Sequence, residues 1–315
     1  MAARDLQGRC EVHRAPTTRI VSLLPSATEI VCALGLADQL VGISHSCDFP
    51  ASVTDRPRLS RPRYNPDGLS SGEIDAAVRA ALRDYGSVYE IDVDGINALE
   101  PDLILTQGIC DVCAVSESQL HTLKSGPDEA LRFKRSDSPG ARLSVSAQIV
   151  SLDAHDLAAI FNSIETVGRA TGATDRARSL VADMHKRIAA VRERVADRPR
   201  PRVLALEWLD PPYVPGHWVP ELVAAAGGQL LAGTARRPSY RMEWADLQGL
   251  EPDVLLVMPC GFNLEESQRE AIRHKQQLRV VGGRVQLLDA SAYFSRSGPR
   301  VIDGLEILAS AIFPA

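Results

Sequence analysis

The sequence predicts an α/β protein of two lobes, each built around a central, mostly parallel sheet, with one long helix joining them. Three observations lead to this prediction. A strand, a helix and a second strand follow one another in residues 19–50. The second half of the chain repeats the first half in order, and an uninterrupted amphipathic helix lies between the halves. The 315 residues suffice for two lobes of ordinary size.

The first unit of this pattern begins with the apolar residues of segment 20–24, a run that is typical of a buried parallel strand. Ser26 and Glu29 have the spacing of a capping box. In such a box the serine oxygen accepts from the N–H of Glu29 and the carboxylate accepts from the N–H of Ser26. Gly35 is expected to end the helix, and residues 39–43 to form the next strand.

The loops after these two strands are the first candidate site. Ligands of open α/β sheets bind beyond the carboxyl ends of the strands, often at helix N-termini. Pro25–Ser26 and His45–Asp48 are therefore expected to lie on one rim. An ordinary strand–helix–strand unit without any site would show the same local pattern.

The internal repeat predicts a second, similar lobe. Three pairs of segments correspond in order: 19–23 with 202–206, 33–41 with 225–231, and 99–105 with 250–256. In the last pair, Leu-Glu-Pro-Asp ends a helix and a buried strand begins in both halves. One match could arise by chance, whereas three in the same order indicate a duplicated architecture.

The region between the halves is predicted to be helical. Residues 156–170 form one helix closed by Gly172, and Thr174–Ala196 form a second one. Apolar residues recur at steps of three and four from Leu180 to Val195 without an internal Pro or Gly. We expect this helix to be a stiff connector that ends near Arg198. The expected division of the chain is an N-terminal extension (1–18), an N-terminal lobe (19–154), linking helices (155–198) and a C-terminal lobe (199–315).

The composition excludes several classes of protein. The net charge is −5 and no basic stripe is visible, so no nucleic-acid partner is expected. No stretch approaches the roughly 20 apolar residues of a membrane span. The first 18 residues lack the apolar segment of a signal peptide. We therefore expect a monomer in the cytoplasm, or a periplasmic or surface-attached protein if a signal segment has been removed.

Aromatic residues gather in loops of the second half. The three tryptophans lie at 208, 218 and 244, and Tyr213, Tyr240, Tyr293 and Phe294 accompany them. Large amphipathic rings on loops suit a flat, bulky ligand that needs apolar contact and a few hydrogen bonds. The alternative is that some of these rings cap the core of the lobe.

Cysteines and histidines in strand-end loops suggest a second kind of site. Cys110 and Cys113 form a C-x-x-C pair, which is a weak metal signal without a second pair. Cys47, His45 and His217 also lie in strand-end loops, with Cys260 as a tentative further ligand. Thiolates and imidazoles together could bind zinc or iron, whereas reduced cysteines packed in loops would explain the pattern equally.

Standard enzyme signatures are absent from the sequence. There is no G-x-G-x-x-G, Walker A, H-E-x-x-H or G-x-S-x-G motif. His45 with Asp48, or Glu207 with His217, could act as acid and base, although such pairs more often hold a ligand. No catalytic residue is assigned, and the protein is not predicted to be an enzyme.

The motifs resemble a known family. Residues 19–50, with SLLPSATEIVCALGL and VGISHSCDFP, resemble the start of the cobalamin-binding, class III substrate-binding proteins of ABC importers. The segments DLILTQGICDVCAV, EWLDPPYVPGHW, MPCGF and AYFSRSGPRVIDGLEILA are similar to a branch of that group without an obvious signal peptide. The resemblance covers about Arg19 to Phe313.

This resemblance implies two α/β lobes joined by one long helix, with a ligand in a shallow cleft between them. It also implies a possible partner, the permease of an ABC transporter, which family members dock through one acidic residue per lobe. Glu117 and Glu221 are candidates for that contact. The ligand contacts implied by the resemblance are Pro25, Ser26, Gln107, Glu207, Trp208, His217, Trp218, Tyr293 and Arg296. We add His45, Asp48, Tyr89, Tyr240, Phe262 and Phe294 as further ligand-binding candidates.

The predicted function is therefore a binding protein for a corrinoid such as cobalamin, or for a related metal chelate. Trp208 and Trp218 are expected to form an aromatic wall of the cleft, facing Pro25–Ser26 and the loop 107–113. The alternative is a cytoplasmic metalloprotein or enzyme that uses zinc or iron in a Cys/His cluster. That cluster would contain Cys47, Cys110 and Cys113, and tentatively Cys260. A pure interaction module is a third possibility without specific support.

Overall fold

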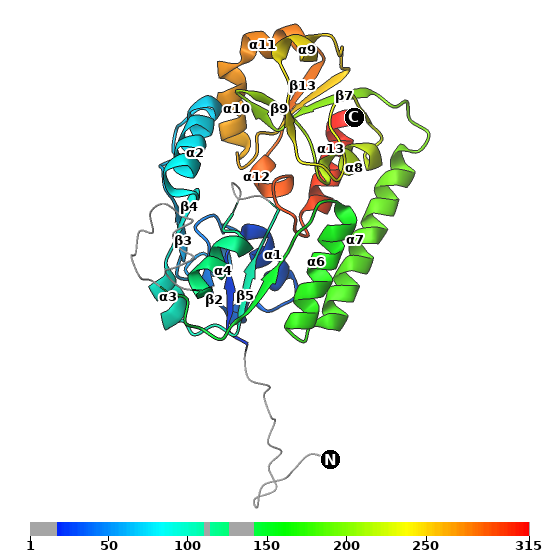
Figure 1. Cartoon of the computed structure of the whole chain (residues 1–315). Coiled ribbons are helices and arrows are strands. Elements are labelled where there is room, and N and C mark those ends of the chain that lie inside the picture. Colours follow the sequence, from blue (N-terminus) through cyan, green and yellow to red (C-terminus); the bar gives the residue numbers. More distant parts are fainter. Residues whose placement is uncertain (1–17, 110–113, 126–141, 315) are drawn as a thin grey trace, which may run out of the picture.

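Two parallel four-stranded sheets form the centres of two lobes, which lie one above the other in Figure 1. The structure, a computed structural model, describes residues 18–109, 114–125 and 142–314. Its architecture confirms the predicted fold class, including the long helix that joins the lobes. None of the described helices has the length and apolar character needed to cross a lipid bilayer.

The N-terminal lobe has the strand order β2-β1-β5-β6, and all neighbouring strands are parallel. A small antiparallel pair, β3 and β4, lies beside it. The elements are β1 (Ile20–Ser22), α1 (Pro25–Ala33), β2 (Leu40–Ile43), β3 (Ser60–Pro62), α2 (Ser71–Tyr85), β4 (Tyr89–Ile91), α3 (Val93–Ala98), β5 (Leu103–Thr106), α4 (Glu117–Ser125) and β6 (Gln148–Ser151).

The C-terminal lobe has the corresponding parallel order β10-β7-β12-β13, with a small antiparallel sheet β11-β9-β8 added. Its elements are β7 (Arg202–Leu206), β8 (Trp208–Leu209), β9 (Pro212–Val214), α8 (Val219–Ala225), β10 (Gln229–Leu230), β11 (Tyr240–Arg241), α9 (Trp244–Gln248), β12 (Val254–Val257), α10 (Leu264–Arg273), α11 (Lys275–Val281), β13 (Arg284–Leu287), α12 (Ala290–Tyr293) and α13 (Val301–Ile312).

The repeated Leu-Glu-Pro-Asp motif forms the same corner in both lobes. The backbone N–H of Arg19 donates to the carboxylate of Asp102 at 2.8 Å. In the second lobe the N–H of Arg202 donates to Asp253 at 2.7 Å. The glutamate of each motif has a left-handed backbone, with φ of 42° at Glu100 and 45° at Glu251. The duplication detected in the sequence is therefore a duplication of local structure.

Two antiparallel helices, α6 (Leu157–Ala170) and α7 (Thr174–Val195), connect the lobes. The buried stripe of α7 includes Met184 and Ile188 and packs against α6 as well as α13 of the C-terminal lobe. Arg187 of α7 pairs with Asp303 and Glu306 of α13. The predicted continuous connector is confirmed, and it ends at Val195, three residues before the expected end.

Helix α2 makes a second connection between the lobes, on the side of the molecule opposite to α7 (Figure 1). It begins with a capping box between Ser70 and Glu73. Its first residue, Ser71, contacts Glu270 of α10 in the other lobe. The two lobes are thus held together at both sides of their interface.

Candidate functional site

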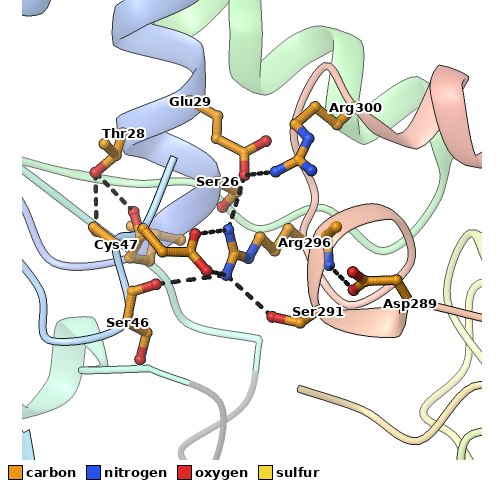
Figure 2. A network of polar contacts seen from close by, with 12 residues as sticks. Ser26, Thr28, Glu29, Ser46, Cys47, Asp289, Ser291, Arg296 and Arg300 are labelled. Carbon is orange, nitrogen blue, oxygen red and sulfur yellow. Dashed lines mark hydrogen bonds and ion pairs between the residues drawn. The ribbon is translucent and has the colours of Figure 1, made fainter. Parts of the chain in front are cut away.

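The loops that follow the strands of the two sheets meet between the lobes, and Arg296 lies at the centre of this contact (Figure 2). Arg296 belongs to the segment between α12 and α13 of the C-terminal lobe. Its guanidinium donates to both carboxylate oxygens of Asp48, at 2.5 and 2.9 Å, and to Glu29 at 3.1 Å. The hydroxyl of Ser291 accepts a further hydrogen bond at 3.1 Å. Two acidic groups of one lobe therefore bind one arginine of the other.

Glu29 does not form the predicted capping box with Ser26, and that prediction is wrong. Helix α1 begins at Pro25 after Leu24, and no side chain caps its N-terminus. Glu29 instead turns toward the other lobe, where it pairs with Arg296 and, at 3.4 Å, with Arg300 (Figure 2). Two cationic partners attract the carboxylate more strongly than one neutral backbone N–H would.

The electrostatics of this cluster follow from burial and from the arginines. Burial raises the pKa of the Glu29 carboxyl, and the charges of Arg296 and Arg300 offset only part of that rise. Burial also raises the pKa of Asp48, but hydrogen bonds and the charge of Arg296 outweigh it and leave the pKa below its usual value. Asp48 is therefore the firmly ionised member of the cluster at neutral pH.

His45 lies on the predicted rim but has other partners than Asp48. Its Nδ1 is 3.0 Å from the hydroxyl of Ser60, and its ring centroid is 5.0 Å from that of Tyr89 in β4. Burial, and secondarily the charge of Arg58, lowers the pKa of His45 to about 4. The imidazole is therefore neutral at pH 7, which suits a hydrogen-bonding residue better than the acid–base role that the sequence left open.

The loop after β7 carries the corresponding candidates of the C-terminal lobe. Glu207 is half-buried and accepts from the hydroxyl of Ser239 and from the N–H of Gly216. Burial raises the pKa of Glu207 to about 7, despite these two hydrogen bonds. The half-exposed ring of Trp208 meets that of Phe262 edge to face, with 5.3 Å between the centroids. The loop after β7 thus carries a carboxyl and an aromatic ring that packs on Phe262 from the segment after β12.

Trp218 does not contribute to an open aromatic wall, which corrects the expectation for this residue. Its side chain is only 8% exposed and belongs to the core cluster shared by both lobes. Its indole N–H donates to the carbonyl of Phe294 at 3.0 Å, and Phe294 is itself buried. Because α8 begins at the next residue and packs against α13, the ring of Trp218 is directed into the core.

His217 lies at a second contact between the halves of the chain. Its backbone is left-handed, with φ of 51°, and its ring centroid is 5.7 Å from that of His155, which follows β6. Beside it, Arg236 pairs with Asp156 at 2.8 Å. Burial and the neighbouring His155 lower the pKa of His217. His155 was not among the predicted residues, because a histidine directly before a helix carries no distinctive motif.

The remaining candidates lie in the same strand-end loops or beside them. Pro25 is the first residue of α1, and Ser26 accepts from the hydroxyl of Ser297 at 3.5 Å. Gln107 is mostly buried after β5, and its backbone pairs with Ser116. Tyr293 lies under the guanidinium of Arg300 at 4.8 Å. Tyr240 is exposed on β11.

The cysteine cluster is tested only in part. Cys110 and Cys113 lie outside the described residues. The thiol of Cys47 is fully buried and contacts the hydroxyls of Thr28 at 3.0 Å and Ser44 at 3.3 Å. Cys260 is exposed in the other lobe. Within the described residues, no group of three or more His, Cys, Asp or Glu side chains is arranged to hold a metal ion.

A cavity of about 510 Å³ lies away from these loops, between α6, α7 and α8. Phe161, Ile188, Arg192 and Glu221 are among its lining residues, and none of the predicted ligand-binding residues is. Glu221, a candidate for transporter docking, accepts from the N–H of Leu157 at 2.8 Å. Its carboxylate therefore caps the N-terminus of α6.

Comparison with known proteins places this geometry in context. A family model described as "Periplasmic binding protein" matches residues 20–281. An uncharacterized ABC transporter substrate-binding lipoprotein of Bacillus subtilis is 25% identical, covering 94% of this chain and 80% of the relative. Two solved structures, each 20% identical, share the fold. A periplasmic haem-binding protein of Pseudomonas aeruginosa has a TM-score of 0.67, and the match covers 95% of this chain and 93% of the Pseudomonas protein. The periplasmic vitamin B12-binding protein of Vibrio cholerae has a TM-score of 0.63, and the match covers 93% of this chain and 96% of the Vibrio protein.

Proposed function

The chain belongs to the periplasmic binding protein family, and we propose that it binds a corrinoid such as cobalamin, or a related metal chelate, between its two lobes. The observation that carries this proposal is the convergence of strand-end loops from both sheets on one interface. Arg296, Asp48 and Glu29 meet there, and Trp208, which packs on the buried Phe262, presents partly exposed aromatic surface in the C-terminal lobe.

The chemistry of these loops suits a large, flat ligand with polar edges. A tetrapyrrole offers an apolar face that stacks or packs on aromatic rings, and it carries hydrogen-bonding groups around its rim. Trp208, supported from behind by Phe262, would contact the face, while Glu207, His217 and Arg296 would meet the rim. Relatives named for binding vitamin B12 and haem share this fold, which supports a ligand of that size.

The family relationship also supports a transport role. Substrate-binding proteins of ABC transporters deliver a small molecule to a permease, and we propose such a partner for this chain. The relatives are binding proteins, which favours binding over the alternative of a metal-dependent enzyme. They give no support to the expected cytoplasmic location, because the relative from Bacillus subtilis is named a lipoprotein.

Titration with cyanocobalamin and with haemin tests the proposal. Both chromophores absorb where indole emits, so binding should quench the intrinsic tryptophan fluorescence beyond the inner-filter control. An absorbance scan of the freshly purified protein and elemental analysis for cobalt, iron and zinc accompany the titration. Absence of quenching by either compound at tens of micromolar, together with stoichiometric zinc, would favour the cysteine-metal alternative.

A further inference from the structure

The two carboxylates that bind Arg296 differ sharply in their exposure to water. The side chains of Arg296 and Glu29 are 8% and 2% exposed, whereas that of Asp48 is 63% exposed. Asp48 nevertheless makes the better contact, because its two oxygens accept hydrogen bonds from two different nitrogens of the guanidinium. Figure 2 shows Arg296 between the segment 46–47 of one lobe and Ser291 of the other.

This difference decides which partner can be exchanged. Removing Glu29 would take from the buried guanidinium a partner that is itself buried, and water could not easily replace it, which is costly. Asp48 is already largely hydrated, so its carboxylate can move into water at little cost in desolvation. Its departure would leave Arg296 paired with Glu29, and the two guanidinium nitrogens that now contact Asp48 would be open to another pair of oxygens.

We propose that Arg296 is a receptor for an oxyanion of the ligand, and that Asp48 competes with that oxyanion for the same guanidinium fork. This inference rests on the proposed function and adds a chemical class to it. The preferred ligand carries a carboxylate or a phosphodiester, because both present two oxygens to a planar guanidinium. Asp48 is thus a specificity-determining residue, because it lowers the affinity for every ligand whose oxyanion must displace it from Arg296.

Two pairs of tetrapyrroles separate the possible sources of the oxyanion. Haemin carries two propionates, which its dimethyl ester lacks. Cobalamin carries the phosphodiester of its nucleotide loop, which cobinamide lacks. Haemin and its ester have the same macrocycle, so a difference in their affinities reports on the carboxylates. Cobalamin and cobinamide share the corrin ring but differ also in the benzimidazole base, so in that pair the change caused by Asp48→Ala, and not the affinity itself, reports on the phosphodiester.

The test compares Asp48→Ala with the wild-type chain, using Asp55→Ala as the matched control. Asp55 is also an exposed aspartate paired with an arginine, but its partner is the adjacent Arg56. Removal of the competitor should tighten binding of the anionic member of each pair, the one that carries the carboxylates or the phosphodiester, about tenfold. The affinity for the member that lacks this group should stay within about twofold of the wild-type value. Asp55→Ala should change neither. An equal change for both members, or no change for the anionic one, overturns the inference.

A second measurement needs no tetrapyrrole. Sodium formate should raise the Tm of Asp48→Ala more than sodium chloride does at the same ionic strength. The reason is that formate can bind the two guanidinium nitrogens of Arg296 that Asp48 has vacated. It should have a smaller effect on the wild-type protein and on Asp55→Ala. Equal Tm shifts in all three proteins would overturn the proposal that Arg296 is an oxyanion receptor. If formate acts as expected but none of the four tetrapyrroles binds, the proposed function fails, and the ligand class inferred from it is rejected as well.

Discussion

Ser71 of the N-terminal lobe donates its backbone N–H, at 3.1 Å, and its hydroxyl to the same oxygen of Glu270 in the C-terminal lobe. Glu270 is completely buried and also contacts Arg273 at 2.9 Å and His274 at 3.1 Å. Together with the continuous helix α7 on the opposite side, this contact restricts the relative motion of the lobes. A small rearrangement of loops, such as the exchange at Arg296, is therefore more accessible than a wide opening.

Substitution of Glu270 should reveal a pH-dependent contribution to stability. Burial raises the pKa of this carboxyl, but hydrogen bonds from His274, Ser71 and Arg273 outweigh it and hold the pKa at about 2. A carboxyl with a depressed folded pKa stabilises the protein above its unfolded value of 4.5, and this contribution is lost as the pH falls toward 2. Glu270→Gln should therefore lower the free energy of unfolding by about 2–3 kcal/mol at pH 7.

Urea denaturation at several pH values measures this effect. The difference between Glu270→Gln and the wild type should shrink as the pH falls below 4.5. Glu265→Gln is the matched control on the same helix, because Glu265 is 77% exposed and pairs only locally with Arg269. Its cost should stay below about 0.5 kcal/mol. A pH-independent difference for Glu270→Gln would contradict the assignment.

Glu207 should have the opposite pH dependence. Its folded pKa of about 7 lies above the ordinary value of 4.5, because burial favours the neutral carboxyl. The stability that this group lends is complete below pH 4.5 and is lost as the pH rises through 7. Glu207→Gln keeps an oxygen that can accept from Ser239, and it avoids the buried charge.

At pH 8 the Glu207→Gln variant should be about 1–2 kcal/mol more stable than the wild type, after allowance for partial exposure. At pH 5 the two proteins should be nearly equal. Thermal unfolding at both pH values checks this expectation. A variant that is less stable at pH 8 would show that the ionised carboxylate contributes favourable contacts beyond those described.

The two tryptophans of the loop after β7 should respond differently to truncation. Trp208→Ala removes a half-exposed ring from the proposed ligand surface, so it should weaken tetrapyrrole binding by about 2 kcal/mol with little loss of stability. Trp218→Ala removes a buried ring and its hydrogen bond to Phe294, so it should cost about 3–5 kcal/mol of folding stability. Isothermal titration and urea denaturation of each variant separate the two effects. Similar behaviour of both variants would contradict the distinction between surface and core.

The thiols of Cys47 and Cys260 should differ in reactivity. Cys260 is exposed, whereas Cys47 is buried, and burial raises the pKa of its thiol. Iodoacetamide at pH 7.5 (about one pH unit below the ordinary thiol pKa) should alkylate Cys260 much faster, as followed peptide by peptide in a mass spectrometer. In denaturant the two rates should converge. Rapid alkylation of Cys47 in the native protein would show that its loop opens readily.

Much of the fold could be predicted because it is encoded in local patterns. The step of three and four residues from Leu180 to Val195 predicted helix α7. The repeated Leu-Glu-Pro-Asp segments predicted two similar lobes. Such patterns act between residues a few positions apart, where backbone geometry leaves few alternatives.

The sequence by itself thus determined the two α/β lobes, their order and the helix that joins them, whereas the tertiary structure decided which polar groups meet. Ser26 and Glu29 have the same capping spacing as Ser70 and Glu73, yet Glu29 pairs with Arg296, which is 267 positions away. Trp218 likewise finds its hydrogen-bond partner in Phe294, 76 positions away. A local cap competes with any charge or core that folding brings near, and the buried partner prevails because desolvation strengthens its electrostatic attraction. That competition depends on the packed arrangement of both lobes, which no local spacing records.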